Sequence, residues 1–171
     1  SGSWNQWRRA NPAVRPNLAG VKFYRKNFVG YNLQGVNFRD AEFGFCTFTK
    51  LNLSGANFEK AYLQGARFTD VLLANAKFDT AFIYGVSFTR TNLVRASFSR
   101  ADLELDGFDD SDIGNASFEH ALLTGAYFSN SLLKQAVFRE ANLRDAFFAR
   151  SDLTGVDFTG AQKDGTYFLN K

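Results

Sequence analysis

"YNLQGVNFRDAEFGFCTFTK", residues 31–50, places Leu33, Phe38, Phe43 and Phe48 five residues apart. An α-helix rotates by about 140° over five residues, so these side chains would not form one stripe along a helix. A β-strand alternates its two faces, so an odd step would send successive members to opposite faces. The spacing therefore predicts a chain that turns after every fifth residue.

The same spacing continues along most of the chain. Every fifth residue from Leu18 to Phe158 is Phe, Leu or Ile, which makes 29 consecutive sites, 16 of them Phe. In the register two residues before the bulky sites, a small residue (Ala, Val, Ser, Thr or Cys) occupies 25 of the 29 positions from Val21 to Ala161. We expect both kinds of position to face the interior, where only small groups fit beside the large ones.

The resulting motif is small, polar, bulky, polar, polar, as in "ANFEKAYLQGARFTD" at residues 56–70. It resembles the pentapeptide-repeat family, and the resemblance covers roughly residues 17–161. The resemblance implies an all-β fold, a right-handed quadrilateral parallel β-helix in which each pentapeptide makes one side and twenty residues make one coil. The resemblance implies a bacterial or cyanobacterial-type repeat domain. Because the chain has no methionine, even at residue 1, we expect this domain to be excised from a larger protein.

Four sides per coil also follow from a period of ten, because Phe and Leu alternate at successive bulky sites. Residues twenty apart should then stack, with Phe on two opposing walls and mainly Leu or Ile on the other two. About seven to eight coils, spaced like strands by about 4.8 Å, would make a rod roughly 35 Å long. The central core is expected to comprise Phe38, Phe58, Phe78 and Phe98, Phe48, Phe68 and Phe88, and Leu33, Leu53, Leu73 and Leu93.

Residues 1–16 are interpreted as an N-terminal cap and residues 17–171 as the β-helix. A short helix is expected before Pro12, with Ser3 and Gln6 forming a capping box, although the initial Ser-Gly-Ser resembles a cloning remnant. Trp4 and Trp7 share one face of this helix and are interpreted as a lid on the first coil, with a ligand or membrane anchor as the alternative. At the other end, an apolar last coil would allow end-to-end association.

Ten of the 14 glycines fall two residues after a bulky site, where a tight corner favours positive φ. The composition gives a net charge of +3 and no apolar run long enough for membrane insertion. The sequence lacks the usual metal, phosphate and nucleophile motifs, so we expect no enzyme activity and no cofactor. His120 is interpreted as a solvated corner residue and Cys46 as a buried core thiol. The expected location is cytoplasmic, although the parent protein could be membrane-attached or targeted elsewhere.

The acidic run at residues 102–112 departs from the mixed charge of the rest of the chain. At one corner, Lys50, Asp70, Arg90 and Asp110 alternate in sign, which predicts surface ion pairs with Arg90 next to Asp110. Asp106 is anomalous because it occupies an inward small-residue site, where a bare carboxylate is unfavourable. We expect this coil to bulge, with Gly107 permitting the distortion, or to bind a cation.

Outward aromatic residues are candidates for a partner surface. Tyr62 and Phe82 should stack on one side of the rod, and Tyr127, Phe147 and Tyr167 on another. These stacks would either bind a protein or simply extend the ladder of the rod. Two further exposed residues, Phe45 and Leu105, are expected to add little.

These features favour a non-catalytic protein-interaction or spacer module with an unidentified protein partner. The alternative comes from the family resemblance, since some members imitate DNA and occupy the type II topoisomerase gyrase. A rod that imitates a duplex over about 35 Å would need on the order of twenty negative charges, whereas this chain carries +3. Nucleic-acid binding is not favoured either, because Arg90, Arg95 and Arg100 lie at successive corners and form no continuous basic stripe.

Overall fold

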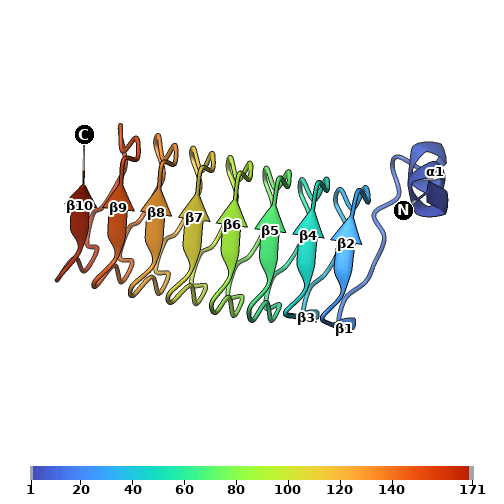
Figure 1. Cartoon of the computed structure of the whole chain (residues 1–171), viewed down its shortest axis with the longest axis horizontal. Helices are drawn as coiled ribbons and strands as arrows, with labels where there is room; N and C mark the ends of the chain where they lie inside the picture. Colours follow the sequence, from blue (N-terminus) through green and yellow to red (C-terminus); the bar gives the residue numbers. More distant parts are fainter. Residues whose placement is uncertain (1, 170–171) are drawn as a thin grey trace.

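The computed structural model describes residues 2–169, which form a short helix followed by a parallel β-solenoid of about seven turns (Figure 1). The predicted fold class, a parallel β-helix with one short N-terminal helix, is confirmed. Figure 1 shows the coils in a row, with α1 at the end next to β2 and with β10 at the opposite end. The division between residues 16 and 17 stays a prediction.

The regular strands are three residues long and form two parallel sheets. The larger sheet has eight strands in the order β10-β9-β8-β7-β6-β5-β4-β2, and the smaller sheet pairs β1 with β3. The elements are α1 (Gly2–Ala10), β1 (Lys22–Tyr24), β2 (Asn27–Val29), β3 (Glu42–Gly44), β4 (Thr47–Thr49), β5 (Arg67–Thr69), β6 (Ser87–Thr89), β7 (Gly107–Asp109), β8 (Tyr127–Ser129), β9 (Phe147–Ala149) and β10 (Tyr167–Leu169).

The register between coils is twenty residues throughout. Phe48 pairs with Phe28 in β2 and with Phe68 in β5. The other sides follow the same register through isolated parallel bridges such as Asn57 with Lys77. Each inner coil therefore forms backbone hydrogen bonds to both of its neighbours.

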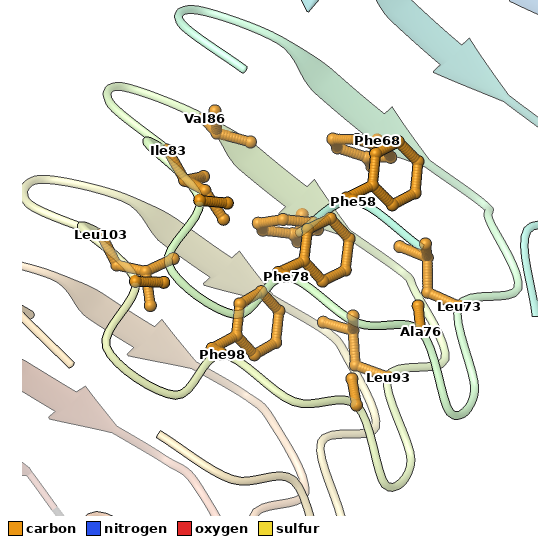
Figure 2. Packing of buried hydrophobic residues seen from close by; sticks show 14 of the residues in the cluster. Phe58, Phe68, Leu73, Ala76, Phe78, Ile83, Val86, Leu93, Phe98 and Leu103 are labelled. Carbon is orange, nitrogen blue, oxygen red and sulfur yellow. The ribbon is translucent and has the colours of Figure 1, made fainter. Parts of the chain in front are cut away.

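The interior consists of stacked side chains (Figure 2). Phe58 and Phe78 lie 4.9 Å apart between ring centroids with planes 1° from parallel, and Phe68 and Phe88 are also 4.9 Å apart. Rings from the two Phe walls meet edge to face, as for Phe78 and Phe88 at 6.0 Å and 82°. The structure buries every member of the expected core set: Phe38, Phe58, Phe78, Phe98, Phe48, Phe68, Phe88, Leu33, Leu53, Leu73 and Leu93.

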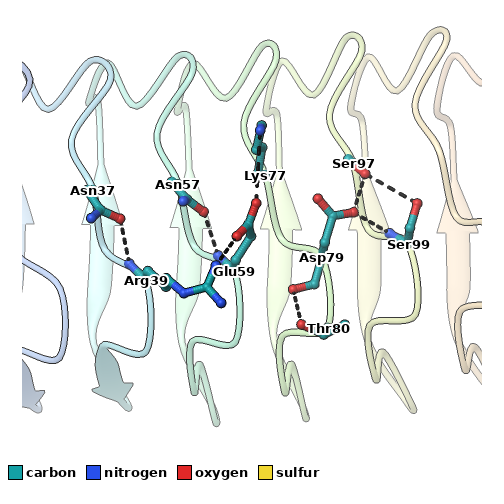
Figure 3. Close-up of polar contacts among 9 residues, drawn as sticks. All are labelled: Asn37, Arg39, Asn57, Glu59, Lys77, Asp79, Thr80, Ser97 and Ser99. Atoms are coloured by element: carbon teal, nitrogen blue, oxygen red, sulfur yellow. Dashed lines mark hydrogen bonds and ion pairs between the residues drawn. The ribbon is translucent and has the colours of Figure 1, made fainter.

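The coils turn at left-handed corners. Every fifth residue from Gly20 to Gly165 has a positive φ, and these 30 residues comprise ten glycines and 20 other residues. Many corners are preceded by Asn or Asp, whose side chain accepts a hydrogen bond from the backbone two residues later. Asn57 Oδ1, for example, accepts from the backbone N–H of Glu59 at 2.9 Å (Figure 3). This local hydrogen bond satisfies a backbone N–H near the turn that would otherwise be bonded to water.

Helix α1 docks on the first coil through side chains. Trp4 packs against the core, and its Nε1 donates a hydrogen bond to the backbone oxygen of Asn32 at 2.7 Å. Asn5 accepts from the backbone N–H of Asn32 and donates to the oxygen of Gly30, both at 2.7 Å. These contacts cover backbone groups and apolar surface that the first coil would otherwise expose.

Two details of the predicted cap are different in the structure. The helix begins at Gly2, so Ser3 lies within the first turn and the capping box with Gln6 is wrong. Trp7 contacts Trp4 at 5.6 Å between ring centroids, with planes tilted by 37°, but remains 41% exposed. Trp4 therefore makes the contact with the core, while Trp7 lies on the outer surface of the helix.

Candidate interaction surface

One side of the solenoid carries a cluster of exposed aromatic residues near the N-terminal end. The inward column of this side contains Phe43, Leu63 and Ile83, which the register places directly above one another. The outward residues of the same side and its corner include five aromatic rings that are each 46–58% exposed. We call these five residues the aromatic patch: Tyr24, Phe45, Tyr62, Phe82 and Tyr84.

Contacts between the rings hold part of the aromatic patch in place. Tyr62 and Phe82 stack 4.7 Å apart with planes 10° from parallel, as the sequence predicted for this pair. Tyr24 meets Phe45 edge to face at 5.8 Å. Phe45 lies over Gly65, where an added Cβ would come within 2.6 Å of the ring. The patch therefore presents large apolar groups whose positions are already restricted.

A groove of about 470 Å³ opens within the aromatic patch. Tyr24 and Tyr62 line it, and Gly44 leaves the space between them unfilled. An added Cβ at Gly44 would come within 3.0 Å of the Tyr24 ring. Lys22 and Glu42, which form an ion pair at 2.7 Å, give the groove a polar margin. An apolar groove with a few polar groups at its margin suits the binding of a side chain from another molecule.

The second predicted stack is only partly formed. Phe147 and Tyr167 are parallel at 5.2 Å, as predicted. Among the aromatic contacts of residues 2–169, none joins Tyr127 to Phe147. The Tyr127 ring instead lies over Gly107, where it fills the space that a side chain would need. The expected three-residue stack is therefore wrong at Tyr127, because the glycine one coil earlier offers that ring a closer surface.

Asp106 is fully buried and does not distort its coil. Its Oδ1 accepts a hydrogen bond from the backbone N–H of Val86 at 2.7 Å, while Oδ2 has no partner within the described part of the chain. Gly107 pairs in register with Ser87 and Tyr127, so the predicted bulge is wrong. Burial raises the pKa of the Asp106 carboxyl to about 9, so the group is neutral at pH 7 and needs no counter-ion.

Charged side chains form ladders of alternating sign along the rod. On the side shown in Figure 3, Glu59 pairs with Arg39 and approaches Lys77 at 4.0 Å. Arg90 pairs with Asp70 at 2.7 Å, as the alternating corner predicted, whereas the ion pairs of residues 2–169 do not include Arg90 with Asp110. The hydrogen bond from Arg90 lowers the pKa of Asp70. Both partners are exposed, so such a pair contributes little to stability. The ladders do, however, leave no side of the rod uniformly acidic.

The structure brings together no obvious catalytic or metal-binding group among residues 2–169. No cluster of three or more His, Cys, Asp or Glu lies close enough to hold a metal ion in that range. His120 contacts Glu140 at 3.1 Å on the surface. Burial raises the pKa of the Cys46 thiol, which disfavours the reactive thiolate. No helix in the same range has the length and apolar composition needed to span a membrane.

Sequence reasoning found two of the five residues of the aromatic patch. It missed Tyr24, Tyr84 and the groove at Gly44, and it discounted Phe45 because that residue stands at a corner. The sequence does indicate that Tyr24 and Tyr84 lie in one outward column, because their residue numbers differ by a multiple of twenty. Counting outward residues column by column would have found them.

Solved structures with the same architecture include full-length QnrB1, a plasmid-mediated fluoroquinolone resistance protein. QnrB1 is 23% identical with a TM-score of 0.50, over 88% of this chain and 92% of QnrB1. HetL from the cyanobacterium Nostoc sp. strain PCC 7120, involved in heterocyst differentiation regulation, is 20% identical with a TM-score of 0.36, over 92% of each chain. Rfr23 from the cyanobacterium Cyanothece 51142 is 21% identical with a TM-score of 0.36, over 98% of this chain and 99% of Rfr23. At these identities, the likeness is one of fold alone.

A comparison with curated protein sequences finds no significant match. The family model for the pentapeptide repeat region matches residues 21–98 and 91–168. Because these matches cover most of a chain whose backbone turns at every fifth residue, the protein belongs to the pentapeptide-repeat family.

Proposed function

We propose that this protein is a non-catalytic interaction module that binds another protein through the aromatic patch. The observation that carries this proposal is the grouping of five exposed aromatic rings on one side of the rod, two of which, Tyr24 and Tyr62, line a groove. Tyr and Phe are enriched at protein interfaces because they bury much apolar surface with little loss of conformational freedom. The partner is expected to insert an apolar side chain between Tyr24 and Tyr62.

The rest of the rod supports a spacer role in the same module. Its core is continuous from coil to coil and its register does not slip, so the distance between its two ends is fixed by the number of coils. The pair formed by Phe147 and Tyr167 lies near the far end and is a second proposed contact surface, with Tyr127 beside it. A rod that binds at two places would hold its partners at a set separation.

Site-specific photo-crosslinking tests the patch. A crosslinking residue is placed at Tyr84 or at Leu132, which is similarly exposed but lies on another side of the rod. The same partner should be captured from position 84 and not from position 132. The double variant Tyr62→Asn, Phe82→Asn should abolish the capture, and Asn is compatible with the fold because Asn142 occupies the same column. Equal capture from both positions, or undiminished capture by the folded double variant, contradicts the proposal.

A gyrase-binding role as a DNA mimic is the alternative function and receives less support. It rests on the family resemblance, and the likeness to QnrB1, a fluoroquinolone resistance protein, is one of fold alone. Several acidic residues of this chain are paired with Arg or Lys on the surface, as in the pair of Arg139 with Asp157 at 2.6 Å. Inhibition of gyrase in a supercoiling assay at stoichiometric amounts of the protein would favour the DNA mimic over the interaction module. We expect no inhibition.

A further inference from the structure

A second cavity, of about 440 Å³, lies between the N-terminal segment and one edge of the solenoid. Helix α1 and the loop after it contribute Arg8 and Arg15 to its walls. The coils contribute the remaining walls, with small residues such as Gly55 and Ala74 on the floor. The volume falls in the range of small-molecule sites in proteins.

Arg8 is the unusual member of this lining because it is only 5% exposed. Its terminal nitrogens donate hydrogen bonds to the backbone oxygens of Val14 and Gln34. Its Nε has no partner, and no carboxylate of residues 2–169 lies within ion-pair distance of it. Backbone oxygens satisfy donors but do not neutralise a charge. A buried guanidinium without a counter-ion is unfavourable, and an anion in the adjacent cavity would compensate it.

The other charged residues of the cavity add to this imbalance. Arg15 and Lys77 also line it, whereas no Asp or Glu does. The nearest carboxylate to Lys77 is that of Glu59, at 4.0 Å. The cavity therefore gathers three cationic side chains and no anionic one. This differs from the outward sides of the rod, where charges of opposite sign alternate.

The floor of the cavity leaves room for a ligand. An added Cβ at Gly55 would meet no atom within 4 Å, so the space above that backbone is open. Ser54 and Asn75 bring a hydroxyl and an amide to the same lining. Both groups are suitable donors to the oxygens of an anion.

We propose that this cavity binds a small molecule through a phosphoryl group. Three cations favour a ligand that concentrates negative charge, and a phosphoryl group carries about −1.5 to −2 at neutral pH. Arg8 supplies a fixed charge at the wall, while Arg15 and Lys77 contact the anion from its more open side. The site is independent of the aromatic patch, since the two share no lining residue.

Calorimetric titration of the full chain with sodium pyrophosphate at constant ionic strength tests the proposal. Lys77→Asn removes one cation and keeps a residue type that the same column holds at Asn57. Ala74→Gln fills the floor without changing the charge, and Gln34 shows that the column accepts glutamine. Lys60→Asn is the matched control, because it changes the net charge equally at a corner outside the cavity.

We expect saturable one-to-one binding of pyrophosphate by the wild type. Lys77→Asn should weaken the affinity by about 3- to 10-fold, as for the loss of one partly exposed charge. Ala74→Gln should weaken it at least as strongly, while Lys60→Asn should leave it within about twofold. Absence of saturation, or equal losses of affinity in Lys77→Asn and Lys60→Asn, would indicate only general attraction of the anion to a basic protein. Either result would contradict the proposed site.

Titration with succinate at the same ionic strength separates phosphoryl from carboxylate recognition. Pyrophosphate should bind more tightly than succinate. The Nε–H resonance of Arg8, assigned by its loss in Arg8→Lys, should move only with the ligand that saturates the site. Tighter binding of succinate, or an unchanged Arg8 resonance at saturation with pyrophosphate, would contradict the assignment to a phosphoryl group.

Discussion

At the scale of single residues, the corners of the coils determine which side chains the fold accepts. The backbone of each corner is left-handed, a conformation that is unfavourable by about 1–2 kcal/mol for most residues other than glycine. Asn and Asp tolerate it better than β-branched residues do. Thr80, with φ of 57°, is therefore the most strained of the corner residues.

Replacing Thr80 by Gly is expected to stabilise the protein by about 0.5–1 kcal/mol. The relief of backbone strain exceeds the entropy that glycine gains in the unfolded chain. Gly85→Ala is the matched control, because its added methyl would meet nothing within 4 Å and the variant isolates the strain at φ of 64°. It should destabilise by about 1 kcal/mol. Urea denaturation measures the free energy of unfolding of both variants. A loss of stability in Thr80→Gly would show that the backbone of Thr80 is not strained.

Asp106 is expected to make the stability of the fold depend on pH. Burial raises the pKa of this carboxyl to about 9 in the folded protein, against about 3.9 in an unfolded chain. The folded state thus binds the proton of Asp106 more tightly than the unfolded chain does. The contribution of this group to the free energy of unfolding is fully present below about pH 4 and is lost as the pH rises toward 9. Titration of Asp106 changes the free energy of unfolding by at most about 1.4 kcal/mol per pH unit.

Comparison of the wild type with Asp106→Asn between pH 5 and 8 tests this effect. Asn keeps an oxygen acceptor for the backbone N–H of Val86 and has no proton to lose in this range. The wild type should lose stability across the interval, while the variant should change much less. Parallel curves for the two proteins would show that Asp106 is not a buried neutral acid.

At the scale of elements, α1 stabilises the exposed end of the first coil. Parallel coils leave backbone donors and acceptors unpaired at each end, and such an end favours pairing with another chain. The helix provides side-chain partners for Asn32 and Gly30 and apolar cover from Trp4. The stability of the first coil should therefore depend on Trp4 much more than on Trp7.

Substitution of each tryptophan by alanine separates these roles. Trp4→Ala removes a partly buried ring and a hydrogen bond, and it should destabilise the first coil by about 2–3 kcal/mol. Trp7→Ala should change the stability of the first coil by less than about 1 kcal/mol, since the Trp7 ring is half exposed. Amide hydrogen exchange at Leu33 and Gly35, both bonded to the next coil, gives the measurement. Equal exchange in the two variants would exclude a special role for Trp4.

The polar elements of the core were less predictable than the apolar ones. Thr91, Ser111 and Ser131 fit the small-residue rule, but the structure shows that the hydroxyl of each serine accepts from the backbone of the coil before. The rule describes volume, whereas these bonds depend on side-chain rotation. For the same reason, the sequence predicted that Asp106 points inward but not that one hydrogen bond holds it there without a bulge.

At the scale of the whole molecule, the fold repeats after twenty residues and could be predicted almost completely. The bulky residues are periodic, and a coil of twenty residues brings Phe onto Phe and Leu onto Leu over most of its length. The surface could not be predicted to the same extent, because each outward residue depends on a neighbour one coil away and on the direction of its side chain. The Tyr127 ring, which lies over Gly107 and does not stack on Phe147 although the two residues pair in register, is an example.

The repeat predicts which deletions the fold tolerates. Removal of residues 111–130 takes out one coil and leaves every column in phase, so the shortened protein should unfold cooperatively with a modest loss of stability. Removal of residues 111–125 takes out three sides and places Phe over Leu, and Leu over Phe, at the junction between the coils before and after the deletion. That variant should lose far more stability. Thermal denaturation followed by circular dichroism compares the two, and similar midpoints would contradict a core defined by stacked columns.

The ladder of hydrogen bonds between coils also has a mechanical consequence. Because each coil is held mainly by its neighbours, a force applied to the two termini would detach coils one after another from the ends. Each detached coil releases twenty residues, an extension of about 65 Å. Stretched in an optical trap, the rod would lengthen in nearly equal steps and shorten again by rewinding, so the molecule would behave as a graded spring.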